Sequence, residues 1–207
     1  MFVPKISNTF SASLNILLLS KKRYVGNPST WLLGALAASG PLALSIHVQS
    51  VPAISEELEV SYSVAQLTVS LFLITFATSQ LIIGPLSDKI GRRPVIFGGL
   101  ILLGISSLAA TFAPSIELLI LARIIQGFGG CATLVVPRAI VQDLYKGLKA
   151  AKMTALVAMV QSIAPLSAPI IGRILDNIFG WRAVFAFLTL FTFLLSIWAL
   201  GYLKETR

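Results

Sequence analysis

The sequence predicts an all-α membrane protein that crosses the bilayer six times. Hydrophobic residues make up 56% of the 207 positions and charged residues only 12%, whereas a soluble domain usually carries about 25% charged residues. Six apolar runs are each long enough to span a hydrocarbon layer of about 30 Å, which takes about 20 helical residues. Backbone groups cannot stay unpaired in lipid, so each run is expected to be a helix.

The six predicted spans are joined by mostly short polar links, so neighbouring helices should run antiparallel in one up-and-down bundle. The spans are 31–54, 64–86, 93–112, 116–136, 153–175 and 183–203. Residues 30–207 are therefore expected to form a six-helix transmembrane bundle, and residues 1–29 a cytoplasmic N-terminal extension. The longest link, RAIVQDLYKGLKAAK at 138–152, is expected to form a surface helix.

The distribution of cations predicts the orientation of the bundle. All but Arg123, Arg173 and Arg182 of the 16 Lys and Arg residues fall on the side that holds both termini. Cytoplasmic loops carry such an excess of Lys and Arg, so both termini are expected in the cytoplasm. The net charge of +8 lies in short clusters between apolar runs, which argues against nucleic acid as a partner.

The scarcity of reactive side chains excludes several classes of function. The chain has one cysteine, Cys131, and one histidine, His47, so no cluster of metal ligands is expected. No nucleophile, base and orienting group occur together, so we expect neither an enzyme nor a cofactor.

One connection, GPLSDKIGRRP at 84–94, is unusually polar for its surroundings. Gly84 and Pro85 are expected to end one helix and Pro94 to open the next, where its missing N–H costs nothing. Gly91 allows the positive φ of a very tight turn. The charged residues would pair with one another or anchor the turn at the membrane surface; they are Asp88, Lys89, Arg92 and Arg93. A plain positive-inside hairpin is the alternative.

The spacing of this turn closely resembles the loop between helices two and three of major facilitator superfamily transporters. The segments SIELLILARIIQGFGG, RAIVQDLYKG and APLSAPIIGRILDNIFGWRAVF extend the resemblance, over about residues 50–207, to the bicyclomycin/chloramphenicol resistance (Bcr/CflA) drug-efflux branch. The resemblance implies a multidrug transporter of the bacterial cell inner membrane that exchanges a small-molecule drug for protons. It also implies that the 84–94 turn is a conformational gate.

Within ARIIQGFGG at 122–130, Arg123 lies about seven residues from the nearer helix end, or roughly 10 Å of helical rise. A charge at that depth is costly unless it is paired or faces water. Gln126 shares its helix face, and Gly127 and Gly130 permit close helix packing. The resemblance assigns Arg123 to substrate binding or proton coupling. The alternative is that its side chain reaches outward to the interface.

Two further segments depart from the family pattern. APLSAPIIGR at 164–173 resembles the antiporter motif, and Pro165 and Pro169, followed by Gly172, favour a hinge or merely a kinked packing helix. In SIHVQSVPA the family's usual aspartate is replaced by a serine, which leaves His47 and Gln49 as polar candidates. An imidazole can take a proton because its ordinary pKa is about 6.5, although a lone histidine is often a packing residue.

The chain ends just past its sixth apolar run, at YLKETR. By resemblance, a second six-helix half is expected as a partner, as a separate chain or by self-association. One bundle alone is expected to expose Arg123 and Gln126 to lipid. Two alternatives stay open: a truncated, non-transporting remnant and a membrane interaction subunit.

Overall fold

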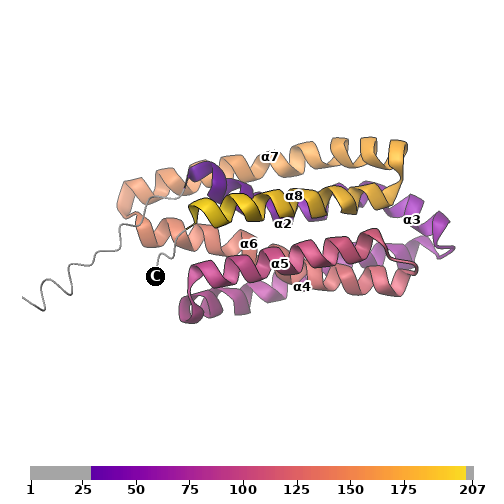
Figure 1. Ribbon diagram of the computed structural model, residues 1–207, viewed down its shortest axis with the longest axis horizontal. Helices are drawn as coiled ribbons and strands as arrows, with labels where there is room; N and C mark the ends of the chain where they lie inside the picture. The colour runs from indigo at the N-terminus through magenta and orange to yellow at the C-terminus, as the bar shows by residue number, and fades with distance from the viewer. Residues whose placement is uncertain (1–28, 204–207) are drawn as a thin grey trace, which may run out of the picture.

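Residues 29–203 are described by a computed structural model, and within that range they form helices and no strand (Figure 1). The all-α prediction is confirmed. The elements are α2 (Thr30–His47), the 3₁₀ helix η1 (Val48–Ser50), α3 (Val51–Glu57), α4 (Tyr62–Ile90), α5 (Arg92–Thr111), α6 (Ile116–Leu144), α7 (Gly147–Phe179) and α8 (Trp181–Tyr202). Six stretches are long and apolar enough to cross a membrane, with α2 through α3 counted as one. The predicted extension lies outside the described residues except for Ser29.

The long helices alternate in direction, so the turns gather at two ends (Figure 1). One end, here the basic end, holds the α4–α5 and α6–α7 turns with Lys89, Arg93 and Lys146; the other, the acidic end, holds the turns near Glu59 and Glu117. Helices α2 and α6 are central, since 67% of the apolar window of each is buried against 22% for α4 and α7. Helix α2 packs against α6, α7 and α8, and α6 also packs against α4 and α5. The core is therefore built around α2 and α6.

The link between the fourth and fifth spans differs from the prediction. The expected surface helix at 138–152 is wrong, because α6 continues to Leu144 and α7 begins at Gly147. The end of α6 stays packed, with Ile140 and Val141 0% exposed in a cluster shared with α2 and α5. Gly147 has a φ of +56°, which glycine tolerates without strain. Two packed helices therefore meet in a tight turn at the basic end.

The prediction that Gly84 and Pro85 end their helix is also wrong. Helix α4 runs through both residues to Ile90 and ends at Gly91, whose φ is +111°. Pro85, which is exposed, removes only the one N–H bond to the carbonyl of Leu81, and helices that cross membranes tolerate such an interruption. Pro94 lies in the first turn of α5, where a missing N–H leaves no bond unmade.

The first span contains an irregular stretch that positions its polar residues. Pro52 has no N–H to bond the carbonyl of Val48, so the regular α-helical ladder is interrupted there. The chain tightens into η1 between α2 and α3, as short 3₁₀ turns commonly do at helix ends. His47 is thereby the last residue of α2, turned inward, while Gln49 in η1 is exposed.

Candidate functional site

A chain of hydrogen-bonded polar side chains crosses the interior of the bundle. It consists of His47 on α2, Thr68 on α4, Ser107 on α5, and Arg123 and Gln126 on α6. Each of the five residues is 0% exposed. Four helices that surround the bundle interior are thus joined through polar groups as well as through apolar packing.

Arg123 is held by backbone carbonyls and by an aromatic ring. Its Nε donates to the Thr68 carbonyl oxygen at 3.2 Å, and Nη1 donates to the Ala43 carbonyl oxygen at 3.0 Å. The guanidinium carbon lies 4.2 Å from the centroid of the Phe72 ring, close enough for a cation–π attraction. Within residues 29–203 no carboxylate pairs with Arg123, and its Nη2 has no hydrogen-bond partner. The positive charge is therefore solvated by dipoles and is not neutralised.

Gln126 carries the network from Arg123 to α5. Its Oε1 accepts from Nη1 of Arg123, and its Nε2 donates to the Ser107 hydroxyl oxygen at 2.6 Å. The Ser107 hydroxyl in turn donates to the Leu103 carbonyl at 2.6 Å. Each amide and hydroxyl is thus used, as buried polar groups require.

The bonds of Thr68 fix the tautomer of His47. The Thr68 hydroxyl donates its one hydrogen to the Ala65 carbonyl at 2.6 Å. At 3.2 Å from that hydroxyl, Nε2 of His47 must then be the donor. Nδ1 is left as a bare lone pair without a hydrogen-bond partner in the described part of the chain. The imidazole is therefore neutral in this arrangement, with one nitrogen available to accept a proton.

The expectation that a single bundle exposes Arg123 and Gln126 to lipid is wrong. Both side chains point between helices, and Arg123 also lies 6.0 Å from the Phe185 ring of α8. Gly127 lies against the backbone of Phe72 on α4. Helices α4 and α6 therefore pack closely next to Arg123 and Gln126. Gln49 is different, since it is exposed and lines a groove of 520 Å³ with Arg173 and Asn177. The candidate pathway residues thus divide into an interior group and an exposed one.

Arg92 is the centre of the 84–94 turn. It is 6% exposed, bonds Asp88 at 2.7 Å and Asp143 at 2.8 Å, and donates to the Ser87 hydroxyl at 2.5 Å. Lys89 is exposed, and the guanidinium of Arg93 lies 5.6 Å from the Phe97 ring centroid. The turn is therefore tied to the end of α6 through Arg92.

Sequence reasoning missed Asp143 and Ser87. Asp143 lies within RAIVQDLYKG, a segment that carried the family resemblance without a role for its acid. The signal was the position of this one acid near the end of a long apolar helix, at the same end as the cationic turn. Thr68 and Ser107 gave no signal, since hydroxyls in apolar helices usually bond their own backbone.

A second cluster closes the acidic end of the bundle. One carboxylate, Glu57, accepts from the Trp181 indole nitrogen at 2.7 Å and from the guanidinium of Arg182. Arg182 also donates to the Ala113 carbonyl at 3.3 Å, in the α5–α6 turn. Different charged groups therefore link the helices at the two ends of the bundle. Arg92 does so at the basic end and Glu57 at the acidic end.

The fifth span is one continuous helix, α7, that includes both Pro165 and Pro169. Its buried residues are Val157, Ala164, Ala168 and Gly172, and the last three are small. Gly172 lies directly against the carbonyl oxygen of Ile46 on α2. Arg173 points away from this contact and is exposed, so the arginine does not disturb the packing face.

Gly130 lies at a comparable close contact between helices, because an added Cβ there would lie 3.1 Å from the Cα of Gly40 on α2.

In residues 29–203 no group of three His, Cys, Asp or Glu residues is placed to hold a metal ion.

Comparison with protein families decides the affiliation of the chain. A family model described as Major Facilitator Superfamily matches residues 30–207. The chain belongs to the Major Facilitator Superfamily. With six helices able to cross a membrane, it is a multi-pass membrane protein of that family.

Relatives of this superfamily member include proteins named for drug resistance. The chain is 33% identical to multidrug resistance protein D of Escherichia coli over 85% of its own length and 45% of that protein. It is 32% identical to a chloramphenicol resistance protein of Pseudomonas aeruginosa, over 89% of this chain and 44% of the other. An uncharacterised MFS-type transporter of Bacillus subtilis, YdgK, is 37% identical over 85% of this chain and 44% of its own length. The chain spans under half the length of each of these relatives.

The fold agrees with that of a solved transporter structure. A peptide transporter crystallised with alafosfalin superposes with a TM-score of 0.76, over 86% of this chain and 39% of that one. The two sequences are 16% identical, so this likeness concerns the fold alone.

Proposed function

We propose that this chain works as the N-terminal six-helix half of a proton-coupled drug exporter in the bacterial inner membrane. The observation that carries the proposal is the buried Arg123, whose charge meets carbonyl oxygens and a ring but no described carboxylate. A charge inside a membrane bundle is expensive and marks a functional site by default. The drug-resistance relatives supply the class of substrate.

Proton coupling would use His47 and Arg123 together. Both side chains contact Thr68, and both lie against Phe185, with ring centroids 5.3 Å apart for His47. A proton on Nδ1 of His47 would add a second positive charge near the guanidinium, and like charges repel strongly in a medium of low dielectric constant. Protonation would therefore favour an arrangement in which water enters between α2, α4 and α6. A ligand shifts a conformational equilibrium only by such a difference in affinity for the two states.

Drug binding would use the exposed polar residues on η1 and α7. Gln49, Arg173 and Asn177 share the groove with Ile170 and Ile174, which gives the mixed polar and apolar lining common in ligand sites. Superfamily transporters bind substrate between two six-helix halves. We therefore infer that a second half, from another chain or a second copy, completes the site.

The orientation follows from the charges at the two ends. Lys89, Arg92 and Arg93 lie at the basic end together with Lys146 and Lys149. From the positive-inside rule we infer that this end of the bundle and both termini lie in the cytoplasm. The 84–94 turn would then act as a gate on the cytoplasmic side.

Drug accumulation in cells that lack their own exporters tests the proposal. The chain would be expressed alone and together with the remaining six-helix half of a drug-resistance relative, and chloramphenicol uptake would be measured. Lower accumulation with at least one arrangement, lost in Arg123→Met, supports an exporter. Unchanged accumulation in both arrangements, with the chain shown to be in the membrane, would contradict it and favour a non-transporting subunit.

A further inference from the structure

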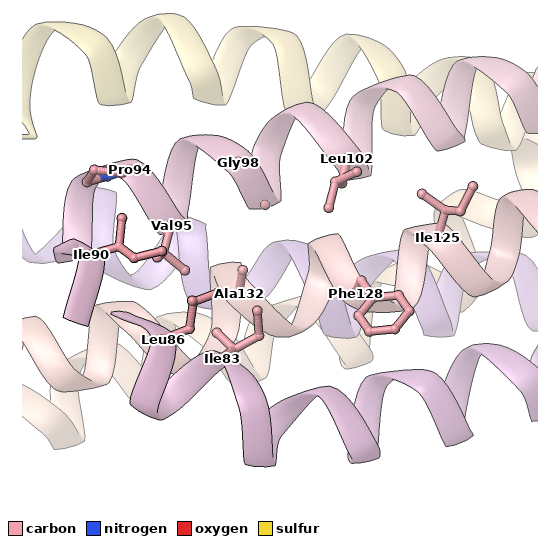
Figure 2. Close-up of a pocket in the computed structure, with 11 residues that line it drawn as sticks. Ile83, Leu86, Ile90, Pro94, Val95, Gly98, Leu102, Ile125, Phe128 and Ala132 are labelled. Carbon is pink, nitrogen blue, oxygen red and sulfur yellow. The ribbon is translucent and has the colours of Figure 1, made fainter. Parts of the chain in front are cut away.

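An apolar groove of 540 Å³ runs along the outside of the bundle between α4 and α5, with α6 as its floor. Figure 2 shows side chains of all three helices converging on it, among them Leu86 of α4, Leu102 of α5 and Phe128 of α6. Its eleven lining residues are apolar side chains and glycines. The groove lies apart from the interior network and from the groove of Gln49.

The groove exists because of local sequence features on α5. Gly98 lines it, and an added Cβ there would meet nothing within 4 Å. Next to it, Gly99 is different, since its Cβ would collide with Ala132 on α6. Gly99 thus draws α5 against α6, while Gly98 leaves the space beside α4 unfilled.

The dimensions and position of the groove match one leaflet of a bilayer. It extends from Pro94 to Leu102 along α5, eight residues or about 12 Å of helical rise. Half of the hydrocarbon layer is about 15 Å thick. Ile90 is 59% exposed and Leu102 43% exposed, so the groove opens to the surroundings of the bundle. In a membrane those surroundings are lipid chains.

Charge marks one end of the groove. Ile90 and Pro94 line that end, and Lys89 and Arg93 directly precede them in the chain. Arg92 is engaged with Asp88 and Asp143. Lys89 and Arg93 add positive charge at the membrane surface, and basic sites between membrane helices bind anionic headgroups.

We propose that this groove binds a phospholipid with an anionic headgroup. One acyl chain lies between α4 and α5 along Leu86, Gly98 and Phe128, and the phosphate lies at the basic end near Lys89 and Arg93. The bound lipid would fill the gap next to the 84–94 turn and so support the α4–α5 hairpin.

Native mass spectrometry of the purified full chain tests the site. The chain would be released from detergent micelles containing equal amounts of phosphatidylglycerol and phosphatidylcholine, and the lipids retained would be counted. We expect one phosphatidylglycerol to be retained in preference to phosphatidylcholine. Lys89→Gln and Arg93→Gln should each reduce that preference by about fivefold, the effect of one basic side chain near an anionic surface.

Gly98→Phe fills the groove and should abolish retention of both lipids. Gly201→Phe is the matched control, because Gly201 on α8 also has open space around its added Cβ, and it should retain lipid like the wild type. Circular dichroism would confirm that each variant keeps its helices. Equal retention by Gly98→Phe and Gly201→Phe would overturn the proposal, as would equal retention of the two lipids by the wild type. Displacement of the lipid by a co-purified second half would also overturn it, since the groove would then be a helix-docking surface.

Discussion

Arg123 and His47 contact different atoms of one residue, Thr68. Nε of Arg123 donates to its carbonyl oxygen and Nε2 of His47 lies beside its hydroxyl, both at 3.2 Å. One residue of α4 is therefore hydrogen-bonded both to a side chain of α6 and to a side chain of α2. A change to the hydroxyl should affect His47 and leave the bond of Arg123 in place.

Thr68→Val should separate these two contacts. The valine keeps the shape of the side chain, but it leaves Nε2–H of His47 buried without a partner, which costs about 1–3 kcal/mol. Thr78→Val is the matched control, because the exposed Thr78 hydroxyl bonds only carbonyls of its own helix. Unfolding in detergent with increasing sodium dodecyl sulfate would measure the free energy of unfolding of both variants. Equal costs for the two variants would contradict the assigned bond.

Arg123→Met should distinguish a functional charge from a structural one. Methionine removes the buried charge, but it leaves Oε1 of Gln126 buried without its donor, while Gln126 keeps its bond to Ser107. We therefore expect the free energy of unfolding to fall by about 1–3 kcal/mol, the cost of one buried polar group without a partner, with the fold kept. Drug export should be lost. Loss of folding together with export would indicate that Arg123 is needed for packing.

The sequence predicts the fold well because apolar length and turn composition determine where helices cross a membrane. It fails at helix ends: Gly84 and Pro85 are turn residues by composition, yet α4 runs through both to Ile90, because one missing N–H bond does not end a helix that crosses a membrane. The depth of Arg123 is readable from its position in a span. Its burial is not, because that depends on which helix faces meet, and its partners Thr68 and Ser107 have no distinctive spacing. Asp143 likewise acquires a role only when α6 ends beside Arg92.

Arg92→Gln should weaken the basic end of the bundle. It removes the buried cation between Asp88 and Asp143, whose carboxylates are 52% and 31% exposed, so the expected cost is that of losing hydrogen bonds to charged groups, about 1.5–3 kcal/mol. Arg93→Gln, one residue away, is the control; since its side chain is only partly buried, its cost should be about 1 kcal/mol or less. The same unfolding titration measures both variants. A smaller cost for Arg92→Gln than for Arg93→Gln would show that Arg92 does not hold the turn.

Two glycines should respond oppositely to alanine. Gly172→Ala places a Cβ against the Ile46 carbonyl oxygen, so α7 must move away from α2; overpacking of this kind costs about 1–3 kcal/mol. Gly98→Ala meets open space and should stabilise α5 by about 0.5–1 kcal/mol, the usual helix preference of alanine over glycine. Thermal unfolding of the purified variants measures the difference. Matching signs would contradict the packing described for α2 and α7.

Proton-driven drug uptake into everted membrane vesicles directly tests whether His47 couples drug export to protons. Vesicles carrying the chain with a second six-helix half would be made acidic inside, and chloramphenicol uptake would be compared with and without the pH gradient. His47 is the one histidine in the sequence. Wild-type vesicles should accumulate drug only with the gradient, and His47→Gln vesicles should retain downhill exchange but lose this gradient dependence. Gradient-driven accumulation by His47→Gln equal to that of the wild type would contradict this prediction.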